Sequence, residues 1–177
     1  MKGFVKFTPI LPKYLWDAKG VPRAVYQELL RQGKIVERMY KRTVSTWRNK
    51  PSFKTKVSGK RMRYGMGYEL TVSYDRRTKG GQHYFYTDWG TERHVIRARR
   101  APRLRFRTKF SPKTRVRVIG SRRGSRDGAW TAPKAVMHPG TEARMFTEEI
   151  HDRRSEKIQD AIISGINSGT KKKSYRG

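Results

Sequence analysis

The stretch "PRAVYQELLRQGKIVERMYKRTVSTWR", residues 22–48, decides the fold of this 177-residue chain because its apolar residues recur at helical spacing. The recurring positions are Val25, Leu29, Val36, Tyr40 and Trp47. Pro22 suits the first turn of a helix, and Pro51 marks the end of the segment. The pattern predicts a long N-terminal helix over residues 22–48, with one face against a core and with arginines and lysines on the other.

The segments that follow this helix have the shorter period of β-strands. Residues 53–60 and 64–76 predict two strands. Between them and the next apolar run, "DRRTKGGQ" (75–82) predicts a loop with a Gly-Gly turn. We expect "HYFYTDW" (83–89) to continue as a strand, which Gly90 ends.

A basic hairpin is predicted after these strands. In "RLRFRTKF" (103–110) and "RVRVIG" (115–120), apolar residues alternate with cations on either side of a Pro-containing turn. Six cations share one face of this hairpin: Arg103, Arg105, Arg107, Lys109, Arg115 and Arg117. The Gly/Ser/Arg-rich residues 120–135 predict a mobile loop that follows the hairpin.

The stretch "VMHPGTEARMF" (136–146) predicts a turn and then a second helix over residues 142–166. Pro139 and Gly140 suit the two central positions of a type II turn. Thr141 is placed to cap the helix, and Phe146 is its first core residue. His138 stands at the entry to the turn, where an imidazole can bond a backbone group, so we expect it to be structural.

The predicted fold class is therefore α+β: a long N-terminal helix, a mostly antiparallel sheet with a protruding basic β-hairpin, and a C-terminal helix. Residues 21–166 form one domain, with the hairpin and the mobile loop inside 91–135. Residues 1–20 predict an extended arm whose aromatic residues pack either on a neighbouring subunit or back on their own domain. Residues 167–177 predict a basic tail.

Charge is the dominant feature of the composition. The chain has 43 Lys and Arg against 14 Asp and Glu, a formal net charge of +29, and only 34% hydrophobic residues. Such a charge attracts polyanions and opposes the compact state of a lone monomer, so nucleic acid or acidic protein surfaces are the expected partners. The chain lacks cysteine, and we expect a soluble protein without a signal peptide or a membrane span.

Catalytic and metal-binding groups are not brought together by the sequence pattern. The four histidines are His83, His94, His138 and His151, and none is paired with another ligand at the i, i+4 spacing of a helical metal site. Carboxylates are few and scattered, unlike the clusters that hold Mg²⁺ in nucleases. We therefore expect no enzyme activity, no metal and no cofactor.

The basic segment from Thr91 to Arg126 carries the functional signal, with 14 Lys and Arg and a single acid, Glu92. Alternate residues of a strand lie about 6.6 Å apart, a spacing similar to that of DNA phosphates. Contacts of this kind are independent of base sequence and sensitive to salt. The residues expected to contact DNA or an acidic partner are Arg97, Arg99, Arg100, Arg103, Arg105, Arg107, Lys109, Arg115, Arg117, Arg122 and Arg123.

Two blocks, "YFYTDWGTERHVIRARRAPRLRF" (84–106) and "VMHPGTEARMF" (136–146), resemble the neck or tail-completion family of tailed bacteriophages. These are small head–tail joining proteins. The matching positions are Gly90, Thr91, His94, Ile96, Leu104, Phe106, His138, Pro139, Gly140, Thr141 and Phe146. The resemblance covers about a third of the chain directly.

The resemblance implies a virion protein that forms a ring, expected to be a hexamer, in the connector between the capsid and the tail. The position in that connector stays open between neck, tail terminator and upper tail tube. Expected partners are other copies of the chain, adjacent head-completion or adaptor proteins, tail-tube or terminator proteins, and genomic DNA in the channel. Assembly would take place in the host cytoplasm. The alternative is a nucleic-acid-coating protein of ribosomal type, which would use the same basic surface without a ring.

Overall fold

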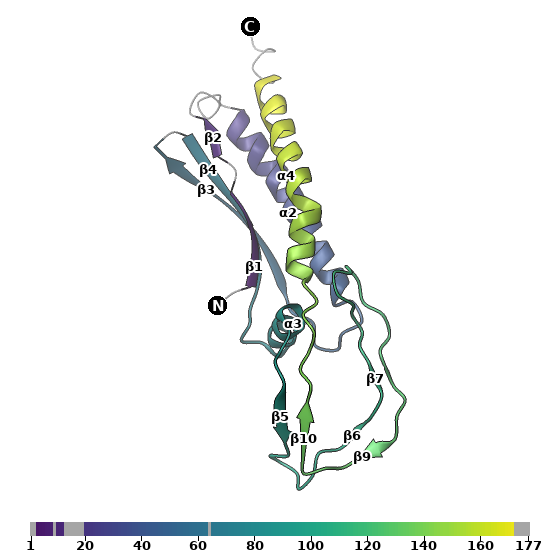
Figure 1. Ribbon diagram of the computed structural model, residues 1–177. Helices are drawn as coiled ribbons and strands as arrows, with labels where there is room; N and C mark the ends of the chain where they lie inside the picture. The colour runs from purple at the N-terminus through teal and green to yellow at the C-terminus, as the bar shows by residue number, and fades with distance from the viewer. Residues whose placement is uncertain (1–2, 9, 13–19, 64, 172–177) are drawn as a thin grey trace.

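The computed structural model describes residues 3–8, 10–12, 20–63 and 65–171. Two long helices lie side by side against an antiparallel sheet, and a long two-stranded ribbon extends from one end of this body (Figure 1). The predicted α+β fold is confirmed: a long N-terminal helix, antiparallel strands, and a C-terminal helix packed on the first helix. No helix in the described ranges is long and apolar enough to cross a membrane.

Helix α2 spans Val21–Thr43 and buries the predicted stripe. Val25, Leu29 and Val36 are fully buried. The helix ends before the predicted residue 48, because the Thr43 hydroxyl donates a hydrogen bond of 2.7 Å to the carbonyl of Tyr40 and the following residues form a turn. β-Branched and hydroxyl side chains lose χ1 freedom in a helix or bond the backbone themselves, which favours a helix end here. Trp47 still packs against the core, from the turn.

The main sheet is organised around β4 (Gly65–Tyr74), which pairs along its length with β3 (Phe53–Met62). The strands predicted at 53–60 and 64–76 are thereby confirmed. Two N-terminal strands, β1 (Gly3–Phe7) and β2 (Ile10–Pro12), also pair antiparallel with β4. Since β3 occupies one edge of β4, β1 and β2 occupy the other.

The N-terminal arm therefore folds back on its own domain over Gly3–Phe7 and Ile10–Pro12, one of the two alternatives for residues 1–20. The aromatic residues Tyr14 and Trp16 of this arm lie outside the described residues. At the other end, the described part of the predicted basic tail belongs to a helix that continues to Lys171.

The strand predicted at residues 83–89 is wrong, since Lys79–Trp89 forms helix α3. The hydroxyl of Thr78 caps this helix by accepting a hydrogen bond of 3.1 Å from the Gly81 amide. A β-carbon at Gly81 would lie 1.9 Å from the Asp75 carbonyl oxygen, so the chain can enter the helix only with glycine there. The aromatic residues suggested a strand by their propensity, but burial of Tyr84 in the core favours the helix.

Helix α4 spans Phe146–Lys171 and begins later than the predicted residue 142. Its predicted apolar stripe is buried: Phe146, Ile150, Ile158, Ala161 and Ile162. It runs antiparallel to α2, and the two backbones approach closely near its C-terminal end. A β-carbon at Gly165 would lie 3.0 Å from the Val25 α-carbon, and one at Gly169 would lie 2.5 Å from the Val21 α-carbon.

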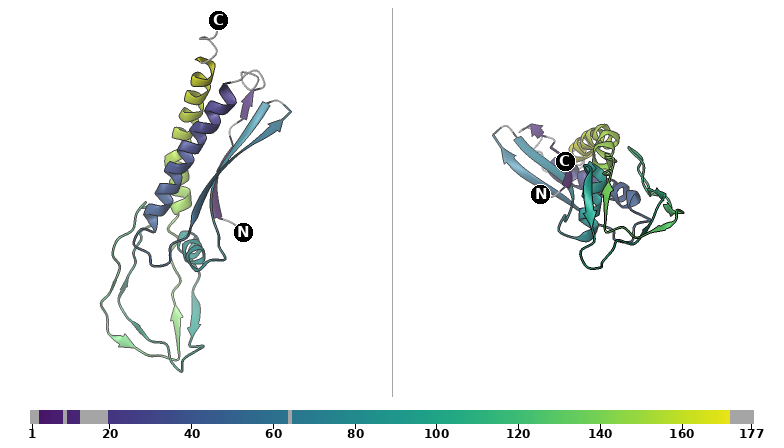
Figure 2. Two further views of the ribbon diagram at one scale, coloured as in Figure 1. Left: turned by 180° about the vertical axis from the view of Figure 1, so that it is seen from behind. Right: turned by 60° about the horizontal axis from the view of Figure 1, so that its bottom comes forward.

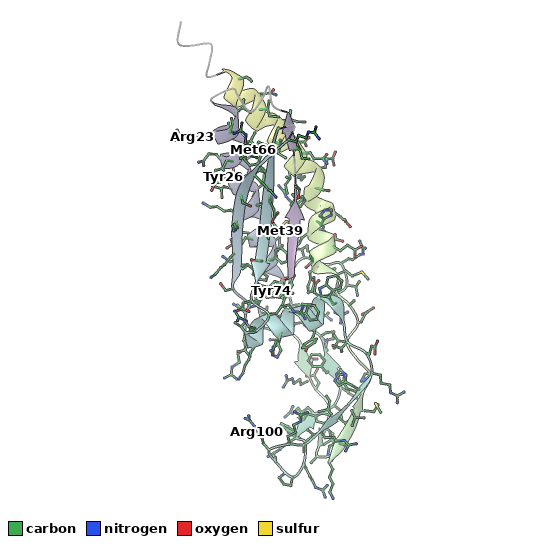
Figure 3. The ribbon with its side chains drawn as sticks, turned by 90° about the vertical axis from the view of Figure 1, so that its left-hand side faces the viewer. Arg23, Tyr26, Met39, Met66, Tyr74 and Arg100 are labelled. Carbon is green, nitrogen blue, oxygen red and sulfur yellow. The ribbon has the colours of Figure 1, made fainter. Side chains whose placement is uncertain are left out.

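Five aromatic rings join the elements of the body into one core. Tyr84 of α3 lies in the middle, with ring centroids 4.9 Å from Tyr74, 5.3 Å from Phe53, and 5.9 Å from both Tyr40 and Phe146. The cluster therefore fixes α3 against both long helices and the sheet at the end from which the ribbon leaves. Figure 3 shows Tyr74 at this lower end of the sheet.

Residues 91–141, which we call the basic ribbon, form one long antiparallel pair of chain segments that bends back toward the body (Figures 1 and 2). Its strand pairs are β5 (His94–Arg97) with β10 (Ala135–His138), β6 (Phe106–Arg107) with β9 (Trp130–Thr131), and β7 (Phe110–Ser111) with β8 (Ser125–Arg126). Further backbone bonds, such as Leu104 N–H to the Pro133 carbonyl at 2.8 Å, connect these pairs.

A protruding basic β-structure is thus present, but the predicted pairing of 103–110 with 115–120 is wrong, and part of the predicted mobile loop at 120–135 forms strands β8 and β9. The true partner of β6 and β7 is the segment 125–131. The predicted pairing would have gathered arginines such as Arg107 and Arg117 on one face of two neighbouring strands. Like charges directly opposite destabilise a strand pair, whereas the observed partner offers Trp130 and fewer cations.

Candidate functional site

The basic ribbon has almost no core of its own. Across residues 91–141, all of which are described, Thr114 alone is buried. Large apolar side chains are exposed on it, including Phe110 at 63% and Trp130 at 58%. Its shape is held mainly by backbone hydrogen bonds, so its side chains stay available to a partner.

All eleven cations that the sequence assigned to a polyanionic or acidic partner lie on the ribbon and are exposed: Arg97, Arg99, Arg100, Arg103, Arg105, Arg107, Lys109, Arg115, Arg117, Arg122 and Arg123. Figure 3 shows Arg100 near the far tip, well away from the helices. Arg103 and Arg122 donate hydrogen bonds to backbone carbonyls of the ribbon. The structure therefore gathers these charges on one projecting element.

Arg117 differs from the other ten cations, because within the described residues it alone of the eleven forms ion pairs. Its guanidinium lies 3.1 Å from the Glu148 carboxylate, 3.7 Å from that of Glu149 and 3.5 Å from that of Asp152, all on α4. With φ of 53°, Arg117 is also left-handed, so it interrupts the strand that the sequence pattern predicted. Its contacts fasten the returning end of the ribbon to the body rather than leaving the charge free for a partner.

A second contact fastens the same end of the ribbon to the turn after α2. The Lys113 ammonium donates a hydrogen bond of 2.9 Å to the Thr46 carbonyl. The hydroxyls of Ser45 and Ser121 lie 3.0 Å apart, and the Thr46 amide donates to Ser121. The ribbon is consequently attached to the body at both of its ends, while its middle projects.

Trp130 is a member of the basic surface that the sequence did not single out. The guanidinium carbons of Arg105 and Arg107 lie 5.1 and 5.2 Å from the centre of its ring, within range of cation–π attraction. We call these three residues the tryptophan patch. The signal available in the sequence was the apolar pair of residues after the Asp127-Gly128 turn, within a segment that otherwise predicted a loop.

Parts of the two sequence blocks that carry the resemblance, 84–106 and 136–146, meet at the base of the ribbon. Thr91 pairs with Thr141, with backbone hydrogen bonds of 2.9 and 3.0 Å, and His94 pairs with His138 in the β5–β10 register. The Thr141 amide also bonds the Thr91 hydroxyl. Thr141 therefore does not cap α4 as predicted, because its backbone completes this strand pair.

Glycines permit this close pairing. Gly140 has φ of +96°, and a β-carbon on it would lie 2.2 Å from the Thr91 carbonyl oxygen. Gly90 has φ of +78°, and a β-carbon there would lie 2.6 Å from the Thr141 carbonyl oxygen. Both values lie in the region that favours glycine, and the value at Gly140 suits the predicted type II turn.

His138 makes the backbone contact that was expected of it. Its Nδ1 accepts a hydrogen bond of 3.0 Å from the Gly140 amide, which holds the turn. Its ring lies 5.0 Å from that of His94, whose Nδ1 is 2.8 Å from the Glu92 carbonyl oxygen. The remaining motif positions divide between the ribbon and the body: Ile96 is exposed, Leu104 and Phe106 are half-buried, Pro139 is exposed and Phe146 is fully buried.

The N-terminus of α4 is capped from another element, by Asp88 near the end of α3. Its carboxylate accepts a hydrogen bond of 3.1 Å from the Thr147 amide and another from the Thr147 hydroxyl. Burial raises the pKa of Asp88, while the bonds from Thr147 oppose that rise. Burial also raises the pKa of the neighbouring Tyr74 to about 12. Sequence spacing could not identify this cap, since 59 residues separate the two partners.

A row of acids on α4 is the other charged feature that sequence reasoning missed. Glu148, Asp152, Glu156 and Asp160 follow one another at intervals of four residues and are all exposed. The spacing is readable in the sequence as charges on one side of a helix. Within the described residues, no group of three or more His, Asp and Glu side chains is arranged to hold a metal ion. The row forms a charged surface along α4.

Comparisons of the chain with protein-family models, with curated proteins and with solved structures gave no match.

Proposed function

We propose that this chain is a structural subunit of the head–tail connector of a tailed bacteriophage, where copies form a ring and the basic ribbon faces DNA or acidic neighbouring proteins. The observation that carries the proposal is the pairing of the two motif blocks. Thr91, His94 and Ile96 of the first block lie directly opposite Thr141, His138 and Val136 of the second block at the base of the ribbon. The two blocks, far apart in the sequence, are thus joined in one structural unit at that base.

The unpaired charge of the ribbon supports a polyanionic or acidic partner. Cations such as Arg99, Arg100 and Arg123 are exposed and form no ion pair within the described residues. Because every copy adds a formal +29, a ring of six copies would be strongly self-repelling without acids or phosphates around it. Genomic DNA in the channel and acidic surfaces of adjacent connector proteins would supply them.

The geometry of the ribbon supports the ring. A closed ring needs heterologous contacts, in which one surface of a copy meets a different surface of the next. A projecting element that buries none of its large apolar side chains is suited to such a contact. The ribosomal-type alternative shares the cations, and in it the exposed Phe110 and Trp130 would stack on bases. It does not, however, require the two sequence blocks that carry the resemblance.

The first test is the mass of the purified, nucleic-acid-free protein by light scattering over a range of salt concentrations, with electron microscopy of the same samples. We expect closed rings, or a monomer that forms rings when head or tail complexes are added. A persistent monomer that binds RNA tightly and ignores phage particles would favour the ribosomal-type alternative.

A second test measures whether the ribbon contacts phosphate. Replacing Arg99 and Arg100 at the tip with alanine should lower the slope of log affinity for DNA against log salt by about 2, since each phosphate contact contributes about 0.9. The matched control replaces Arg23 and Lys34, two exposed cations of α2, and should leave the slope nearly unchanged. Equal slopes for both variants and the parent protein would remove the phosphate contact from the proposal.

A further inference from the structure

The solvent-facing side of α4 carries the acidic row Glu148, Asp152, Glu156 and Asp160, which we call the acidic stripe. Its opposite side is buried through Ile150, Ile158 and Ile162. Of the 14 acids in a chain that has 43 cations, these four fall within 13 residues of one helix side. The stripe is thus a concentrated patch of the opposite sign on a basic protein.

The two halves of the acidic stripe have different surroundings. Glu148 and Asp152 lie in the first two turns of the helix and face Arg117 of the ribbon. Glu156 and Asp160 lie further along and form no ion pair within the described residues. Like charges four residues apart repel on a helix, and Arg153 and Lys157, three residues before Glu156 and Asp160, offset part of that repulsion. Because neither carboxylate is held in an ion pair within the described residues, both remain open to a cationic partner from outside the copy.

Beyond Asp160, the stripe leads into a shallow hollow. It is lined by Asp160, Ile163, Ser164, Asn167 and Ser168. Ile163 is 56% exposed there, a large aliphatic side chain on an otherwise polar surface. The second half of the stripe therefore offers two carboxylates next to an apolar contact, a surface that suits a partner with cations beside an apolar ring.

The tryptophan patch has that complementary chemistry. Arg105 and Arg107 flank the exposed ring of Trp130. In one copy the two surfaces lie at opposite ends of the molecule: β6 and β9 lie at the bottom of Figure 1, and the C-terminal half of α4 lies at the top. They cannot meet within a copy, but they can meet between two copies. The ion pairs of Arg117 with Glu148 and Asp152 are an example of the same ribbon-to-stripe match inside one copy.

We propose that Glu156, Asp160 and Ile163 of one copy receive the tryptophan patch of a second copy. The contact is heterologous, so each copy offers both surfaces and the chain of contacts can close into a ring. The inference rests on the proposed function, because it names the contact between ring neighbours. It also assigns the exposed tryptophan to protein association, while the cations at the ribbon tip remain free for phosphate.

The test measures self-association of the full-length chain by light scattering and sedimentation at low salt. In the variant Glu156→Arg with Asp160→Arg, attraction becomes repulsion, and we expect the apparent dissociation constant to rise about tenfold or more. The matched control is Glu92→Arg with Asp127→Arg, two exposed acids of the ribbon. It changes the net charge by the same amount and should associate like the parent protein. Circular dichroism checks that each variant is folded.

A charge swap makes the test specific. Arg105→Glu with Arg107→Glu should also weaken association by about tenfold or more. A chain that carries both reversals restores opposite charges at the contact and should recover association. Parent-like association of the stripe variant, or no recovery in the combined variant, would overturn the inference. So would a patch variant that loses DNA binding and keeps its association, since the patch would then be a nucleic-acid surface.

A failure of this contact can be distinguished from a failure of the proposed function. If the parent protein and the stripe variant both form rings in electron microscopy, the ring stands and its contact lies elsewhere. If the parent protein stays monomeric in solution at every salt concentration, the contact between copies is overturned. The proposed function then depends on whether the monomer assembles on head or tail complexes.

Discussion

The body and the basic ribbon of this protein follow different physical rules. The body buries long apolar stripes from two helices and a sheet, closed by the aromatic cluster around Tyr84. The ribbon projects well beyond the helices and the sheet in Figure 1, yet Thr114 is its one buried residue. Apolar burial supplies most of the free energy of folding, so the stability of the chain resides in the body. The body holds the fold together, and the ribbon exposes its side chains to partners.

The largest expected effect comes from replacing a phenylalanine by alanine, once in the body and once in the ribbon, and comparing the losses of stability. Phe146→Ala removes a fully buried ring from the core and should lower the free energy of unfolding by about 3–5 kcal/mol. Phe110→Ala removes a ring that is 63% exposed on the ribbon and should lower it by less than about 1 kcal/mol. Urea unfolding followed by circular dichroism measures both. Similar losses would mean that the ribbon folds as part of the core.

The junction of the two regions should show a pH dependence through Asp88. Its pKa is raised in the folded protein, so the folded state holds this proton more tightly than the unfolded state does. The stability that it contributes is fully present below about pH 4, the usual pKa of the group when unfolded, and is lost as the pH rises through the folded value. The asparagine of the variant Asp88→Asn does not titrate, so this pH dependence is absent from the variant.

The measurement is the difference in unfolding free energy between the parent protein and Asp88→Asn, from pH 3.5 to pH 7. We expect the parent protein to lose stability relative to the variant as the pH rises. The prediction would be contradicted if the parent protein became more stable relative to Asp88→Asn as the pH rises. It would show instead that the carboxylate is stabilised by the positive end of α4 more than it is destabilised by burial.

The smallest expected effect concerns His138 at the base of the ribbon. Glutamine can accept a hydrogen bond in place of the imidazole, so His138→Gln should change the free energy of unfolding by less than about 1 kcal/mol and leave association unchanged. Gly140→Ala is the contrasting variant, because its β-carbon would meet the Thr91 carbonyl oxygen. Thermal unfolding compares the two. A larger loss for His138→Gln than for Gly140→Ala would mean that the imidazole does more than hold the turn.

The candidate site was predictable from the sequence in composition but not in arrangement. The cations of 97–123 could be named because their number exceeds any local structural need. Their arrangement depends on partners that lie far away in the chain: Arg117 pairs with α4, and Arg105 and Arg107 flank Trp130. Local patterns cannot supply such partners, since several pairings of a basic segment satisfy the same alternation.

The two long helices and the strands β3 and β4 could be predicted from the sequence alone, whereas the pairing of these strands was seen only in the structure. Over segments of this length, an apolar repeat of about 3.6 residues forms a continuous apolar face only in a helix, and a repeat of two residues does so only in a strand. The net charge and the motif residues could likewise be read from the sequence alone.

Only the tertiary structure decided the helix at 79–89, the cap on α4 and the pairing within the ribbon. Helix α3 places Tyr84 and Asp88 one turn apart, so that Tyr84 packs on Phe146 while Asp88 bonds the adjacent Thr147. A strand, which the aromatic residues favour by propensity, would separate positions 84 and 88 by about 13 Å. Thr141 pairs with Thr91, and Asp88 takes over the cap, because contacts between distant segments satisfy the backbone better than the local alternatives do. Short segments have weak preferences of their own, so the packing around them determines their structure.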